Sequence, residues 1–89
     1  MVNPNDNEIK NLMWLMNQRE YWLLREDGEQ KIGTITGTIG PIIADIEINI
    51  IKSYCRLQNT QYIAPKDGFE RAKMAENIIK EVEPQNTRK

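Results

Sequence analysis

The most constraining feature of this chain is a run of stiff apolar side chains between Lys31 and Tyr54. The run holds nine of the thirteen isoleucines, and so much β-branched surface has to be buried, against the rest of the chain or against another copy. The chain has 89 residues, enough for one small domain over residues 1–89. Such a domain barely offsets the conformational entropy that folding costs, so many need a disulfide, a metal or a partner. Because Cys55 is the one cysteine and there is no histidine, association is the support that remains.

Charge and hydropathy narrow the class of protein. Thirteen acidic and twelve basic residues give a net charge of −1, spread fairly evenly along the chain, which differs from the basic footprint of a nucleic-acid-binding domain. No apolar run approaches the roughly 20 residues that a membrane-spanning helix needs. The first residues have neither the basic nor the apolar region of a signal peptide. We therefore expect a protein that is cytoplasmic at its synthesis and has protein partners, with neither a membrane nor a nucleic acid among them.

A first helix is predicted over residues 7–26. Its apolar side chains recur at helical spacing, with polar residues between them. Asn5 or Asp6 is expected to cap its N-terminus, with Glu8 completing a capping box. Gly28 is expected to end the helix in a left-handed conformation.

The isoleucine-rich run begins with a glycine- and threonine-rich segment, residues 31–40, and continues into a second predicted helix over residues 41–59. Three glycines and three threonines disfavour a helix in the segment, so we interpret it as an extended or flexible connector. Pro41 suits the first residue of the helix that follows. Two alternatives remain open. Isoleucines at spacings of three and four also fit one continuous heptad-like helix through the segment, and the alternation over residues 46–50 also fits a strand.

A third helix is predicted over residues 68–83. Asp67 belongs to a turn that contains a proline, and it can cap this helix with Glu70 at the third position. Pro84 is expected to end the helix, which leaves residues 84–89 as a frayed polar tail. The predicted fold class is therefore all-α, with about three helices in a single small domain.

The residues that could carry chemistry are few. The glycine spacing in residues 31–40 fits neither a dinucleotide-binding fingerprint nor a phosphate loop. Cys55 has no histidine to activate it. The carboxylates of Glu26, Asp27 and Glu29 have the pattern of a solvated turn and lack the ligand spacing of a calcium loop. We expect no enzymatic activity, no cofactor, no metal site and no small-molecule substrate.

Two groups of side chains are candidate protein-interaction sites. The first is aromatic and lies on the first predicted helix: Trp14, Tyr21 and Trp22. At least one of these rings should be pushed towards the surface if the leucine and methionine side chains face the core. The second group is an isoleucine ridge on the second predicted helix, made of Ile43, Ile46, Ile50, Ile51 and Tyr54. That helix is apolar on more than one side, so it should lie between other elements or against a neighbouring subunit.

Parts of the sequence resemble structural proteins of tailed bacteriophages. The segment Ile50-Ile51-Lys52-Ser53-Tyr54-Cys55, followed by Pro65, Gly68-Phe69-Glu70 and Met74-Ala75, resembles the small head–tail connector proteins. The segment Arg19-Glu20-Tyr21-Trp22-x-x-Arg25, with Ile46-Glu47-x-x-Ile50-x-x-x-Tyr54-x-Arg56 further on, is similar to phage minor head proteins. Both resemblances imply a helical component of a virion head or neck that works by assembly. The connector family adds ring formation at the portal.

The expected function is that of a non-enzymatic structural or assembly protein, a phage head or neck component incorporated in the virion. It would self-associate as a homo-oligomer or dock onto a larger protein assembly. One alternative is a small regulatory binder, such as an inhibitor or adaptor that covers another protein. Another is a helix-turn-helix DNA binder over residues 41–83, against which the near-neutral charge and the long connection between residues 58 and 68 argue.

Overall fold

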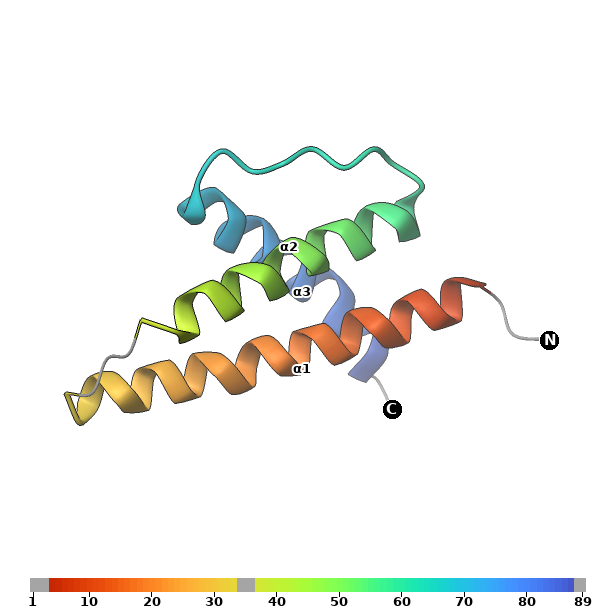
Figure 1. Ribbon diagram of the computed structural model, residues 1–89. Helices are drawn as coiled ribbons and strands as arrows, with labels where there is room; N and C mark the ends of the chain where they lie inside the picture. The colour runs from red at the N-terminus through yellow and green to blue at the C-terminus, as the bar shows by residue number, and fades with distance from the viewer. Residues whose placement is uncertain (1–3, 34–36, 88–89) are drawn as a thin grey trace.

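The chain folds into three α-helices. The computed structural model describes the backbone of residues 4–33 and 37–87, and the side chains of residues 6–33 and 37–82. The helices are α1 (Pro4–Lys31), α2 (Ile39–Gln58) and α3 (Gly68–Thr87), and the described residues contain no strand. Figure 1 shows α1 and α2 side by side in opposite directions, with α3 crossing behind them and the 59–67 connection running back along α2. The all-α prediction is confirmed.

The first helix is longer at both ends than predicted. It begins at Pro4, so Asn5 and Asp6 lie inside it and are not caps. A proline fits the first helical position because its N–H would have no partner there. The helix also continues through Gly28, whose carbonyl accepts a 3.2 Å hydrogen bond from the N–H of Ile32. The left-handed residue at the end of α1 is Gly33, with φ of 77°, so the prediction that Gly28 stops the helix was wrong.

The second helix begins two residues before Pro41. Its first turn therefore contains Pro41, where the missing N–H costs little because the first four N–H groups of a helix lack partners within it. The connector is shorter than the predicted 31–40, since its first residue belongs to α1 and its last two to α2, and residues 34–36 lie outside the described ones. Residues 32, 33, 37 and 38 are not helical, which contradicts the continuous-helix alternative. The strand alternative over residues 46–50 was also wrong.

The third helix confirms its predicted start and corrects its predicted end. The N–H of Glu70 donates a 2.9 Å hydrogen bond to Oδ1 of Asp67, which is the expected capping contact. The helix continues through Pro84 to Thr87, beyond the predicted end at residue 83. A proline removes its own N–H and its ring crowds the carbonyl four residues earlier, but its φ is already helical, so it can weaken or kink a helix without ending it. Of the predicted tail, residues 88 and 89 lie outside the described residues.

All three helices contribute to one core. Its buried apolar side chains are Leu12 and Leu15 from α1, Ile50 and Ile51 from α2, and Ala75, Ile78 and Val82 from α3. Fully burying one isoleucine or leucine contributes roughly 1.5–3 kcal/mol. Helix α2 packs extensively against both α1 and α3, whereas α1 and α3 have few contacts with each other. The prediction that the second helix lies between other elements is confirmed. No helix in the described part of the chain is long and apolar enough to span a membrane.

Candidate functional site

The isoleucine ridge lies inside the molecule. Ile43, Ile50 and Ile51 are 7%, 0% and 1% exposed, respectively. The other two members of the ridge, Ile46 and Tyr54, are half-buried and pack against the same core. These side chains are covered by the chain's own helices, so in this fold the three buried isoleucines offer no surface to a partner.

The aromatic residues of α1 are placed differently. Trp14 is 59% exposed and Tyr21 is 51% exposed, which confirms that rings of this group reach the surface. Trp22 is half-buried and contacts the Tyr21 ring edge-on, with centroids 5.1 Å apart and an interplanar angle of 86°. The guanidinium of Arg25 lies 5.7 Å from the centroids of both rings. The three side chains hold one another in place, because the two rings attract each other edge-to-face and the quadrupole of each ring attracts the cation.

One face of α1 is turned away from the other helices, and we call it the outward face. It consists of Lys10, Trp14, Asn17, Gln18, Tyr21 and Arg25. All but the half-buried Gln18 are exposed. At 100° per residue, Lys10, Trp14 and Tyr21 lie at least about 100° around the helix from the buried Leu12 and Leu15, and Gln18 lies at the edge of the face nearest Leu15. Leu24, 67% exposed, flanks the face and adds to its apolar surface.

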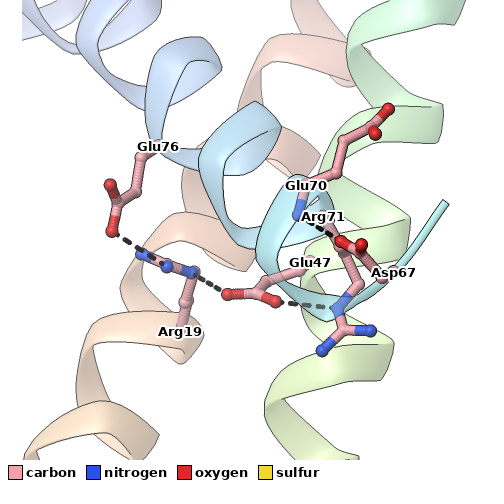
Figure 2. A network of polar contacts seen from close by, with 6 residues as sticks. All are labelled: Arg19, Glu47, Asp67, Glu70, Arg71 and Glu76. Carbon is pink, nitrogen blue, oxygen red and sulfur yellow. Dashed lines mark hydrogen bonds and ion pairs between the residues drawn. The ribbon is translucent and has the colours of Figure 1, made fainter. Parts of the chain in front are cut away.

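A buried ionic network, which was not predicted, joins the three helices (Figure 2). The Glu47 carboxylate of α2 accepts hydrogen bonds from Nε of Arg19 on α1, at 2.8 Å, and from Nε of Arg71 on α3, at 3.0 Å. Glu47 is 3% exposed and Arg19 is 7% exposed. A longer ion pair of 3.6 Å joins Arg19 to the exposed Glu76.

The sequence contains a signal for this network. Arg19 follows Leu12 and Leu15 by seven and four residues, and Glu47 lies four residues from both Ile43 and Ile51. Each charge therefore occupies the middle of an apolar helical stripe, a position where a charged side chain is buried only if it is paired. All buried side-chain nitrogen and oxygen atoms in the described part of the chain have hydrogen-bond partners. The Glu47 carboxylate is held by two guanidinium groups from the other two helices, which gives it a structural role.

A second polar cluster joins the start of α1 to the end of α2. Ser53 Oγ donates a 2.6 Å hydrogen bond to Oε2 of Glu8, and Arg56 donates two, of 3.1 and 3.2 Å, to the same carboxylate. The hydrogen bonds from Arg56 and Ser53 lower the pKa of Glu8 below its usual value. Glu8 therefore holds two helices together and does not form the predicted capping box.

The described residues contain no group of three or more cysteine, aspartate or glutamate side chains that could hold a metal ion. Cys55 is half-buried and packs against the core. The Tyr54 hydroxyl donates a 2.7 Å hydrogen bond to Glu81, which raises the pKa of Tyr54 above its ordinary value and makes it a poorer proton donor.

Comparisons with protein-family models, with curated proteins and with solved structures found no match to this chain.

Proposed function

We propose that this protein is a non-enzymatic helical module that docks onto a larger protein through the outward face of α1. The observation that carries the proposal is the exposure of Trp14 and Tyr21 on a helix whose other face completes the core. Tryptophan and tyrosine are the residues most enriched among the side chains that dominate binding energy at protein interfaces. Two large rings one above the other on a surface helix are suited to contact a partner.

The burial of the isoleucine ridge favours docking over self-assembly through α2. Self-association through that surface would require α2 to leave its contacts with α1 and α3. The resemblance of parts of the sequence to phage connector and minor head proteins supports a place in virion assembly, as a head or neck component. In that setting the outward face would attach the module to a larger structural protein.

A second function uses the same surface. A small regulatory binder also needs a compact fold with one exposed aromatic face, and the cluster of Tyr21, Trp22 and Arg25 supplies it. The two functions differ in the partner, which is a repeated virion subunit in the first and a single regulated protein in the second.

The test identifies the protein that touches the outward face. A photo-crosslinking amino acid replaces Trp14 in cells that produce the protein, and a matched variant carries it at Lys80, an exposed position on α3. We expect a specific cross-linked protein from position 14 and none from position 80. Equal cross-linking from both positions would contradict the proposal.

The identified partner is then purified and its affinity measured by calorimetry. Replacing Trp14 and Tyr21 by alanine should weaken binding about thirtyfold or more, since a hot-spot side chain contributes at least about 2 kcal/mol. Ile63→Ala, at a side chain that is 75% exposed elsewhere in the molecule, is the control and should bind like the wild type. Unchanged affinity of the double variant would overturn the proposal.

A further inference from the structure

The outward face has a symmetric order of side chains. Along the helix it presents a base, an aromatic ring, two amides, an aromatic ring and a base, in the order Lys10, Trp14, Asn17, Gln18, Tyr21, Arg25. The bases and rings are spaced by four, seven and four residues, which keeps them within about 60° of one another around the helix. Two aromatic rings, with two amides between them, are therefore bracketed by two positive charges.

Both charges are available to a partner. Among the described residues, neither Lys10 nor Arg25 forms an ion pair, whereas Arg19, Arg56 and Arg71 do. Arg25 is placed against Tyr21 and Trp22, at 5.7 Å from each centroid, and a guanidinium held in this way keeps N–H donors free for a carboxylate. The rise of an α-helix places the backbones of residues 10 and 25 about 22 Å apart.

We infer that the outward face binds an acidic amphipathic segment of a partner protein, with its apolar side chains on Trp14 and Tyr21 and its carboxylates on Lys10 and Arg25. The inference rests on the proposed function and adds the chemistry of the partner. A helix of about four turns carrying an acidic residue near each end and an apolar stripe between them would match the face in length and charge.

Charge also argues against a second copy of this chain as the occupant. An antiparallel pair that places Trp14 on Tyr21 of the other copy also places Lys10 against Arg25 of that copy. A parallel pair in register places each base against itself. Both arrangements bring like charges together at the ends of the contact, which costs binding energy.

A nucleic acid fits the outward face less well, although protein sites for single-stranded nucleic acids also combine aromatic rings with basic side chains. Residues 1–30 carry three bases and six acids, a net charge of −3. Glu20, Glu26 and Asp27 lie along the same helix, so a polyanion would be repelled over much of its length. A protein segment, unlike a polyanion, can carry carboxylates only where they meet Lys10 and Arg25 and so avoid this repulsion.

The test is an unbiased selection. A display library of random 24-residue peptides is selected on the folded protein, and bound peptides are sequenced. We expect the enriched peptides to be acidic near both ends and apolar in the centre. Enrichment of basic or uncharged peptides, or no enrichment, would overturn the inference. A 20-nucleotide oligothymidylate is titrated in parallel, and its binding without any peptide binding would overturn it in favour of a nucleic acid.

Charge reversal then separates this inference from the proposed function. The variant K10E/R25E should bind the selected acidic peptide at least about tenfold more weakly, and a version of that peptide with lysine in place of its acids more tightly. The control K66E/K80E makes the same change in net charge at exposed positions elsewhere and should leave affinity unchanged. If W14A/Y21A abolishes binding while K10E/R25E does not weaken it, the inference about charge fails and the proposed function stands.

Discussion

At the scale of single residues, the molecule depends on one buried carboxylate. Glu47 receives an arginine from each of the other two helices, so its removal leaves Arg19 buried with only the longer contact to the exposed Glu76. Removing one partner of a buried pair is far more costly than the net contribution of the pair, because the remaining charge has lost its solvation. The network is therefore a requirement of this packing more than a source of extra stability.

Glu47→Ala should lower the free energy of unfolding by about 3–5 kcal/mol, measured by urea denaturation followed by circular dichroism. The matched control is Glu76→Ala, which should cost less than about 1 kcal/mol because that side chain is 58% exposed and 3.6 Å from its partner. Equal losses for the two variants would show that Glu47 is not the junction of the three helices.

The Glu8 cluster predicts a dependence of stability on pH. Because Arg56 and Ser53 lower the pKa of Glu8 in the folded chain, the cluster stabilises the protein above the unfolded pKa of about 4.3. That contribution is lost as the pH falls through the lower, folded pKa. Glu8→Gln should therefore reduce the loss in the free energy of unfolding as the pH falls below about 5. Arg56→Gln should reduce this loss as well. Acid profiles that coincide with the wild type would contradict this assignment.

At the scale of elements, the helices could be predicted, but most of their ends could not. Apolar periodicity locates each helix, and the Asp67 cap was predicted correctly because its side chain acts within one turn. The end of α1 was misplaced because Gly28 and Gly33 are equally able to adopt a left-handed conformation. Only Gly33 does so, with φ of 77°. The network of Glu47 was missed for a related reason, since its partners lie 28 and 24 residues away in sequence.

The two glycines give a pair of predictions with opposite signs. Gly28→Ala should stabilise the protein by about 0.5–1 kcal/mol, since alanine is the better helix former and nothing lies within 4 Å of the added carbon. Gly33→Ala should destabilise it by about 1–2 kcal/mol, because alanine disfavours a positive φ. Both are measured as shifts in the midpoint of thermal unfolding. A destabilising Gly28→Ala would mean that α1 ends at Gly28, as the sequence alone suggested, and a stabilising Gly33→Ala would mean that Gly33 is not left-handed.

At the scale of the whole molecule, the sequence showed an excess of apolar surface without showing what covers it. The isoleucine ridge has the same pattern whether its own chain or another copy buries it, because the pattern describes one helix and not its neighbours. The packing of α2 against α1 and α3 shows that the chain's own helices bury the ridge, since Ile50 is 0% exposed. The sequence alone could place the aromatic residues near the surface. Only the structure shows that their face also carries Lys10 and Arg25, neither of which forms an ion pair among the described residues.

The central claim is that the isoleucine ridge is the core of a single chain and that the outward face of α1 is left for a partner. Its most direct test is the absolute mass of the protein by light scattering on a size-exclusion column, at several concentrations in the micromolar range. A mass of 10.4 kDa at every concentration is the predicted result. A defined ring-sized oligomer at these concentrations would contradict it.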